Sequence, residues 1–294
     1  FGSGALTSNT TANYNNAIGA FTLRDNTTGK QNTALGHGAL LANTTADNNT
    51  AIGFNALISN TTGGDNTAVG DRCLDANTTA SANTAMGSGA MGATTTGNQN
   101  TAIGSGALGS NTNGSENTVL GYNALDANTS GGSNVAVGKQ ALTANTTASY
   151  NVAIGVDAMA ANTTGNQNVA VGGLALDANT TGIYHVAIGH LALSTNTTAS
   201  RNIAVGHSAL RFNTTGANNV ALGVNCLSAN TTANDNVAVG YLCMEDNQTG
   251  TKNSAYETNC MYQNTTGSRN CAYGNEALGE NTTGDYNCAF GKAT

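Results

Sequence analysis

Residues 100–117 read "NTAIGSGALGSNTNGSEN", and this phrase decides the fold because the chain repeats it from end to end. A glycine that follows an Ala-aliphatic pair returns every seventeen residues without one insertion or deletion. Only Glu257 stands where this spacing expects the glycine. Because each coil of a stacked solenoid must match the next, such strict spacing favours a solenoid over a diverged globular domain.

Taking that glycine as position 1 of a coil, several other positions form ranks of equal residues. Position 5 is Leu or Met, position 17 is apolar, and position 16 is Ala except at Val119. Positions 8 and 14 are Asn in sixteen of seventeen coils each, with Thr94 and His185 as the exceptions. Stacked Asn side chains can hydrogen-bond amide to amide, so we predict that both ranks are structural. The predicted structural ladder includes Gly19, Gly36, Gly53, Gly104, Ala102, Ile103, Leu108, Asn100 and Asn117.

The charged residues mark the positions that must face water. Of 25 charged residues, 24 lie at positions 2, 3, 6, 7, 12 or 13, and Glu257 is the exception. An unpaired charge inside a narrow stack would be too costly, so the other eleven positions form the skeleton. Charged residues make up only 9% of the chain and aromatic residues 5%, which excludes a thick core. The periodicity in turn excludes a disordered low-complexity tract.

Seventeen residues are too few for two helices and their turns, but they suit short β-strands. We predict one strand at positions 14–17 (residues 100–103) and a second around positions 4–7 (residues 107–110). Asn-Thr-Thr then turns the chain. The sequence thus predicts an all-β protein, a parallel β-solenoid of about seventeen 17-residue coils. It forms a single continuous domain over residues 1–294, and the pattern loosens at 248–294. Whether position 5 or position 17 faces the interior stays open.

The run Asn-Thr/Val-Ala-Ile/Val-Gly followed by x-x-Ala-Leu resembles the head repeat of YadA-like trimeric autotransporter adhesins. It is also similar to phage tail-fibre repeats found upstream of chaperone domains of the peptidase S74 type. The resemblance covers Gly2 to Gly291 and implies a left-handed β-roll, three chains side by side, and an extracellular, cell-surface or virion location. The usual adhesin repeat is shorter, so the Asn-Thr-Thr corner here is enlarged.

A physical argument also favours association with further copies of the chain. One seventeen-residue coil is thin and cannot cover two apolar ranks by itself. Position 15 changes from Thr (Thr33 to Thr118) to Val (Val135 to Val237), as a half-buried interface would. The predicted partner is therefore the chain itself, in a homotrimer or in an end-to-end filament. Because the chain starts at Phe1 in mid-phrase, we also expect a segment of a longer protein.

Catalytic and ligand motifs are sparse, and we predict no enzyme, no cofactor and no metal site. His37, His190 and His207 share position 2, where a solvated surface pair is favoured over a metal site. The Asp residues form no Ca²⁺ ladder, and the Gly-Ser-Gly runs lack a Lys to hold phosphate. A net charge of −7 without a basic run argues against nucleic acid. No apolar run is long enough to predict membrane insertion.

The cysteines allow two interpretations. Cys73 lies at position 4, where Ala is the rule, and Cys271 and Cys288 are stacked at position 15. Cα atoms of neighbouring coils lie about 4.8 Å apart, within disulfide range. The candidate thiol or disulfide ladder is Cys226, Cys243, Cys260, Cys271 and Cys288. Because Cys replacing Ala also behaves as a small buried hydrophobe, free buried thiols are favoured.

The Asn-Thr-Thr corner has a second interpretation, since Asn at position 8 with Thr or Ser at position 10 is an N-glycosylation sequon. The candidate sites are Asn9, Asn26, Asn43, Asn60, Asn77, Asn145, Asn162, Asn179, Asn196, Asn213, Asn230, Asn264 and Asn281. Glycans about 4.8 Å apart would be very crowded. Surface glycans could instead be ligands that stack on exposed rings, with Tyr122, Tyr150, Tyr184, Phe54 and Phe212 as candidates.

Taken together, the sequence predicts a non-enzymatic extracellular fibre or adhesin segment, a rigid shaft that displays a receptor-binding or host-surface-binding end. The main alternative is a self-assembling extracellular filament, glycan-coated through the Asn-Thr-Thr corners. A minor alternative is an ice-binding solenoid with regular Thr ranks. Paired Thr at positions 9 and 10 would point to opposite sides of an extended chain, which weakens that alternative.

Overall fold

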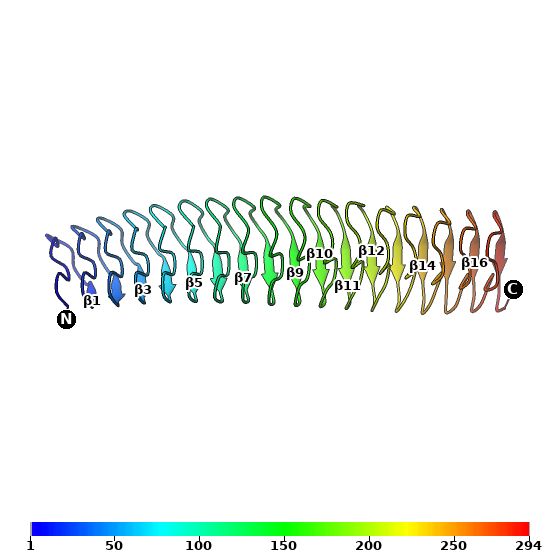
Figure 1. Cartoon of the computed structure of the whole chain (residues 1–294), viewed down its shortest axis with the longest axis horizontal. Coiled ribbons are helices and arrows are strands. Elements are labelled where there is room, and N and C mark those ends of the chain that lie inside the picture. Colours follow the sequence, from blue (N-terminus) through cyan, green and yellow to red (C-terminus); the bar gives the residue numbers. More distant parts are fainter. Residues whose placement is uncertain (1, 294) are drawn as a thin grey trace. The chain divides into compact units, whose positions relative to one another are not determined.

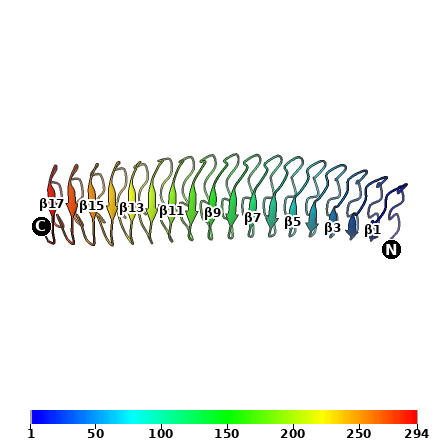
Figure 2. The ribbon, with the colours of Figure 1, turned by 180° about the vertical axis from the view of Figure 1, so that it is seen from behind.

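A computed structural model describes residues 2–293 and divides the chain into two compact units, Phe1–Ser149 and Tyr150–Thr294. In both units each coil contributes one strand of three residues at positions 15–17 (Figures 1 and 2). The first unit holds β1 (Asn16–Ile18), β2 (Thr33–Leu35), β3 (Thr50–Ile52), β4 (Thr67–Val69), β5 (Thr84–Met86), β6 (Thr101–Ile103), β7 (Thr118–Leu120) and β8 (Val135–Val137). The second holds β9 (Val152–Ile154), β10 (Val169–Val171), β11 (Val186–Ile188), β12 (Ile203–Val205), β13 (Val220–Leu222), β14 (Val237–Val239), β15 (Ser254–Tyr256), β16 (Cys271–Tyr273) and β17 (Cys288–Phe290).

Strands within a unit pair in parallel and in register, so that each residue faces its equivalent seventeen positions on. Ala34 in β2, for example, pairs with Ala51 in β3. The strand ends bond in opposite directions: Thr50 N donates to the Asn66 carbonyl of the next coil at 2.8 Å, and Gly53 N donates back to Leu35 at 2.8 Å. The chain is therefore an all-β parallel β-solenoid, as predicted, and no residue among 2–293 is helical.

The interior is lined by positions 4, 5 and 16. Ala51, Ala56 and Leu57, which hold these positions in one coil, have no exposed surface. Full burial of a Leu side chain contributes about 1.5–3 kcal/mol, while the small Ala ranks let the walls of the coil approach closely. Position 17 faces outward instead, with Leu120 48% exposed. This answers the question that the sequence left open.

The second strand predicted at residues 107–110 is wrong, because the backbone there turns. Gly106 and Leu108 have φ angles of 66° and 55°, and the same left-handed conformation returns at positions 3 and 5 of the other coils. A left-handed residue other than Gly costs about 1–2 kcal/mol. Burial of the position-5 side chain offsets that cost. The Leu108 N–H also donates to the Ala124 carbonyl at 3.0 Å, which joins this turn to the next coil.

Position 1 needs glycine because two coils meet there through their backbones. Gly53 has a φ of 137°, and a Cβ on it would lie 2.2 Å from the Gly70 carbonyl oxygen. Glu257 is the one residue other than Gly at this position, and its φ is 106°. A side chain in this conformation costs about 1–3 kcal/mol. Glu257, the one exception to glycine at position 1, is therefore a strained residue.

Glu257→Gly is therefore expected to stabilise the protein by about 1 kcal/mol, the released strain less the entropy that a new glycine loses on folding. The midpoint of urea unfolding at constant m-value measures this. The reverse change, Gly223→Ala, places a Cβ 2.2 Å from the Gly240 carbonyl oxygen and should destabilise. A Glu257→Gly variant with an unchanged or lowered midpoint would show that no strain is stored there.

Candidate functional site

Two ranks of Asn amides stabilise the interior of the coils. The candidate functional surfaces lie outside this interior. At position 8, Asn43 Nδ2 donates to Asn26 Oδ1 of the preceding coil at 2.8 Å and to the Ala46 carbonyl of its own corner at 3.1 Å. At position 14, Asn49 Nδ2 donates to the Gly63 carbonyl of the next coil at 2.9 Å. Asn49 Oδ1 accepts from the Asn66 N–H at 2.9 Å.

The carbonyl at position 11 links the two ranks. The Gly63 oxygen accepts from Asn60 Nδ2 of its own coil and from Asn49 Nδ2 of the preceding one, both at 2.9 Å. These buried amides therefore find partners in neighbouring coils, which is what polar groups without exposed surface require. Within each unit the two ranks couple a coil to the coils before and after it.

The same geometry bears on the predicted glycosylation sites, since a glycan is attached to Asn Nδ2. Eleven of these side chains have no exposed surface: Asn26, Asn43, Asn60, Asn77, Asn145, Asn162, Asn179, Asn196, Asn213, Asn230 and Asn264. Each of them donates from Nδ2 to the position-11 carbonyl of its own corner. Asn281 is half-buried and Asn9 exposed, with the same inward bond. A glycan and this hydrogen-bond network exclude one another.

Thr94 interrupts the position-8 rank and leaves a polar atom without a partner. Asn77 Oδ1 is buried and accepts no hydrogen bond, whereas the equivalent Asn43 Oδ1 accepts from Asn60 Nδ2 at 3.0 Å. Thr94 itself is buried and has no amide to offer the preceding coil. A buried acceptor left unsatisfied costs about 1–3 kcal/mol.

Thr94→Asn should therefore stabilise the protein by about 1–3 kcal/mol, because its Nδ2 would reach Asn77 Oδ1. Its matched control is Asn60→Thr, which creates the same gap by orphaning Asn43 Oδ1 and should destabilise by a similar amount. Chemical denaturation of the three proteins gives both values. Equal midpoints for Thr94→Asn and the starting protein would contradict this account of the rank.

His185 replaces Asn in the position-14 rank and makes the same bonds. Its Nδ1 accepts the Asn202 N–H at 3.2 Å, as Asn Oδ1 does elsewhere. Its Nε2 lies 2.6 Å from the Ala199 carbonyl, where Asn Nδ2 would donate. Because Nδ1 must be unprotonated to accept this hydrogen bond, the neutral ring carries its proton on Nε2. Burial lowers the pKa of His185 to about 4, which keeps this tautomer neutral.

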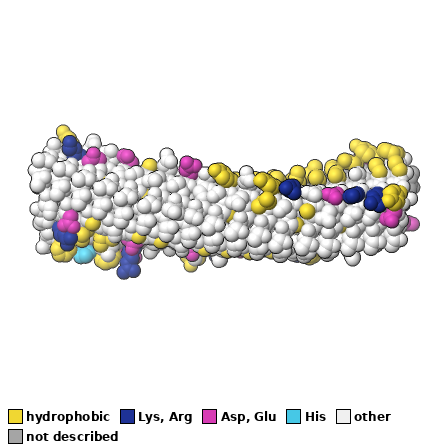
Figure 3. All heavy atoms as spheres, turned by 90° about the horizontal axis from the view of Figure 1, so that it is seen from above, with side chains coloured by type: hydrophobic (Ala, Val, Ile, Leu, Met, Phe, Trp, Pro, Cys, Tyr) yellow, Lys and Arg dark blue, Asp and Glu magenta, His cyan; other side chains and the backbone are white. Residues whose placement is uncertain are grey.

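The strands of the second unit carry apolar side chains on their outward face. We define the aliphatic strip as positions 15 and 17 of β9–β14, which hold only Val, Ile and Leu. Ile154, Ile188, Ile203 and Leu222 are 37–39% exposed, and the other members are half-buried. Figure 3 shows hydrophobic side chains gathered in a ridge in the C-terminal half of the chain. Six strands about 4.8 Å apart, with two ranks each, present on the order of 300 Å² of apolar surface.

The outward face of the first unit is a mixed version of the same surface. Position 15 is Thr from β2 to β7, and position 17 is apolar throughout. Leu35, Met86 and Leu120 are 44–48% exposed. We define the Thr-aliphatic strip as positions 15 and 17 of β2–β8. The change from Thr to Val at position 15 is thus a change in the outward face of the strands.

The predicted surface aromatic residues are exposed but do not form one site. Tyr122, Tyr150, Tyr184, Phe54 and Phe212 are 46–65% exposed and occupy positions 2, 7 and 13. The Phe54 ring stacks on His37 with centroids 5.4 Å apart, and His190 stacks on His207 at 5.5 Å. The Thr pair lies in a bend rather than in extended chain, and its members differ in environment: Thr27 Oγ1 donates to the Thr44 carbonyl at 3.0 Å, while Thr28 is exposed.

The six cysteines are free thiols and fall into two environments. At position 4, Cys73, Cys226, Cys243 and Cys260 have no exposed surface, as expected of small hydrophobes. Burial raises the pKa of the Cys73 thiol to about 12. At position 15, Cys271 is half-buried and Cys288 is exposed, so the prediction of buried thiols is wrong for this pair. Position 15 lies on the outward face of the strand.

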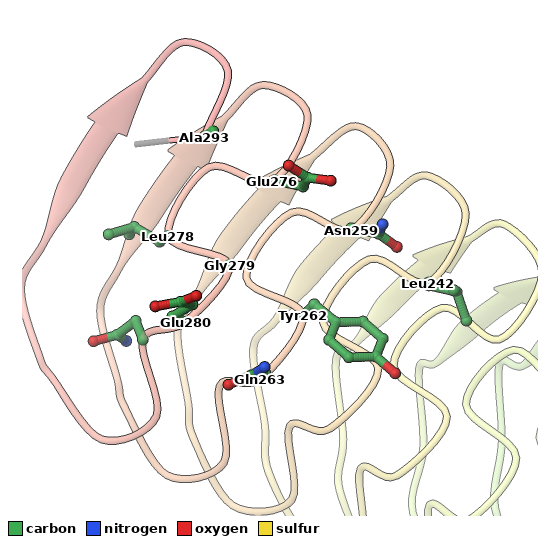
Figure 4. A pocket seen from close by; sticks show the side chains of 10 residues that line it. Leu242, Asn259, Tyr262, Gln263, Glu276, Leu278, Gly279, Glu280 and Ala293 are labelled. Carbon is green, nitrogen blue, oxygen red and sulfur yellow. The ribbon is translucent and has the colours of Figure 1, made fainter.

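A pocket of about 720 Å³ opens at the C-terminal end of the second unit (Figure 4). Tyr262, Glu276 and Glu280 line it together with Leu278 and Asn281. Those last two residues hold positions 5 and 8, which a following coil covers elsewhere in the chain. The pocket is therefore the end of the stack rather than a site built by convergent side chains.

Comparisons with protein families and with curated proteins gave no matching family model and no matching relative. Among residues 2–293, no three His, Cys, Asp or Glu side chains are grouped so that they could hold a metal ion. Within the same residues no helix could cross a bilayer.

Proposed function

We propose that this chain is a non-enzymatic structural shaft that associates side by side with further copies of itself, as a homotrimer, through its outward strips. The observation that carries the proposal is the aliphatic strip, an uninterrupted apolar face over β9–β14. Contiguous exposed apolar patches of a few hundred Å² typically mark interaction surfaces.

The area supports association between copies of the chain. The aliphatic strip offers on the order of 300 Å² of apolar surface, and the strands β2–β8 of the first unit add a mixed Thr-aliphatic surface of similar extent. Covering both strips on two copies would bury on the order of 1,200 Å², which is the lower end of stable protein interfaces. A single strip would fall short, so stable association is expected to need both units.

Such a shaft suits an extracellular, cell-surface or virion setting in which it displays a receptor-binding or host-surface-binding end. Within each unit, backbone and Asn hydrogen bonds couple neighbouring coils, and stability in such repeats accumulates from one interface to the next. The resemblance to adhesin and tail-fibre repeats supports the same proposal. The buried Asn amides do not support a glycan coat. We therefore do not propose a filament that is coated with glycans.

Sedimentation velocity tests the proposal. The purified chain is expected to sediment as a trimer, and Val186→Lys with Val220→Lys in the aliphatic strip should leave it a folded monomer. The matched control is Thr181→Lys with Thr215→Lys, two exposed residues of the same coils. A monomeric starting protein, or a strip variant that stays trimeric, would overturn the proposal. A circular-dichroism spectrum of β type checks that each variant is folded.

A further inference from the structure

Cys271 and Cys288 are the only two adjacent cysteines on the outward face of the described strands. They are in-register partners on β16 and β17. Side chains in register on neighbouring parallel strands lie at the strand spacing, about 4.8 Å. Cys288 is exposed and Cys271 half-buried, so both thiols can meet a solute.

This spacing distinguishes two kinds of sulfur chemistry. The Cα spacing of neighbouring coils lies within disulfide range, but a disulfide also needs Cβ atoms about 3.5–4.5 Å apart. Side chains that stand parallel on in-register strands keep their Cβ atoms nearer to about 4.8 Å, so a disulfide would require the two side chains to lean together. Zinc–thiolate bonds are about 2.3 Å long, and a metal ion with bonds of roughly that length to two thiolates in line spans about 4.6 Å between the sulfur atoms. The in-register pair therefore suits a bridging metal better than a disulfide.

We propose that Cys271 and Cys288 form a two-coordinate site for a soft monovalent metal ion of the Cu(I) class. Thiolates are the ligands that select such ions. On binding, each thiol loses one proton and each sulfur donates an electron pair to the ion, so that one monovalent ion replaces two protons and the complex carries a net charge of −1. No electron is transferred.

The neighbouring groups are consistent with displaceable protons. Burial, and then the adjoining Cys288 thiol, raise the pKa of Cys271, so a metal ion must displace a proton from this sulfur. Binding should therefore strengthen as the pH rises. Tyr273 and Phe290 follow on the same two strands and stack with centroids 6.2 Å apart, which gives the site an aromatic border.

The position-4 cysteines provide an internal comparison. Cys226, Cys243 and Cys260 have the same seventeen-residue spacing but no exposed surface. Their S–H groups donate to the carbonyls of Ala238, Ala255 and Ala272 at 3.2–3.3 Å. Solutes cannot reach these thiols, and each thiol already donates a hydrogen bond. They are therefore not part of the proposed site.

The experiment is a titration of the reduced chain with Cu(I), supplied as its acetonitrile complex under argon and competed with bicinchoninate. One ion per chain is expected, with two sulfur neighbours in the X-ray absorption spectrum. Cys271→Thr with Cys288→Thr should abolish binding, and Cys243→Ala should leave it unchanged. Thr is the natural residue at position 15 in β2–β7, so the double variant is expected to fold.

Three results would overturn the inference. Binding of one ion by the Thr variant would place the metal elsewhere, and absence of binding by the starting chain would remove the site. Conversion of the pair to an intramolecular disulfide by oxidised glutathione, seen as a loss of two hydrogen masses, would refute the spacing argument. The site does not depend on the proposed trimer, because the cysteines lie outside the aliphatic strip of β9–β14.

Discussion

Asn49→Asp is expected to destabilise the protein by about 3–5 kcal/mol at pH 7, although the two side chains have nearly the same shape. In the native coil Asn49 Nδ2 donates to the Gly63 carbonyl at 2.9 Å, and the residue has no exposed surface. An Asp would aim a second carboxylate oxygen at that carbonyl, so two acceptors would face each other in the interior. The folded protein would then hold the carboxyl group in its protonated form.

The destabilisation caused by Asn49→Asp is expected to depend on pH. A raised folded-state pKa for a carboxyl group means that the destabilisation is absent below the unfolded value of about 3.9 and grows as the pH rises through the folded value. Unfolding free energies measured from pH 4 to pH 8 should therefore diverge from those of the starting protein with increasing pH.

The chain offers a matched control for the same chemical change. Asn98 lies at position 12, is exposed, and accepts the Ser81 N–H through Oδ1 at 2.7 Å. Asp47 accepts the Lys30 N–H in the same way, at 2.6 Å. Asn98→Asp should therefore change the unfolding free energy by less than about 0.5 kcal/mol, as exposed substitutions usually do. Equal effects at residues 49 and 98 would refute the account of the interior rank.

The second large effect concerns acid. His185 is neutral in the folded chain with a pKa lowered to about 4, chiefly because it is buried. Its unfolded pKa is about 6.5, so unfolding in acid takes up a proton. The stability that depends on neutral His185 is complete above pH 6.5 and falls as the pH drops toward 4. The loss over that range is about 3 kcal/mol.

The variant His185→Asn isolates this contribution because it restores the residue that the rank otherwise carries. It should match the starting protein near pH 7.5 and exceed it by about 3 kcal/mol near pH 4, as judged by urea denaturation at each pH. Carboxyl groups whose pKa burial raises, such as Asp177, are common to both proteins and cancel in the difference. Parallel pH profiles for the two proteins would show that the imidazole is not held neutral.

Spacing alone predicted the parallel solenoid, since an unbroken seventeen-residue period leaves few other folds. The Asn ranks were also predictable, because identical polar side chains at buried positions can satisfy one another only by stacking. The turn at positions 3–5 was not, since Leu108 adopts a left-handed conformation that its own preference opposes. There the contacts between coils override local propensity.

The orientation of the two apolar ranks could not be derived from periodicity, because both recur at the same interval. A usable signal was nevertheless present. Position 5 holds only Leu or Met, whereas position 17 varies through Leu35, Ile52, Val69 and Met86 to aromatic rings in β15–β17. A fixed shape is typical of a filled interior, and varied shapes are typical of a surface. The outward strips could have been found from that difference.

The position-11 carbonyl has a consequence for how the length of such a chain can change. Because Gly63 accepts one amide from its own coil and one from the coil before, no coil is complete until its neighbour is in place. If seventeen consecutive residues are removed within a unit, whatever the starting point, each remaining residue still stacks on the residue at the same position of the next coil. Removing one residue misaligns all of them. Recombination between coils can therefore lengthen or shorten the protein in whole steps while the hydrogen-bonded interior stays the same.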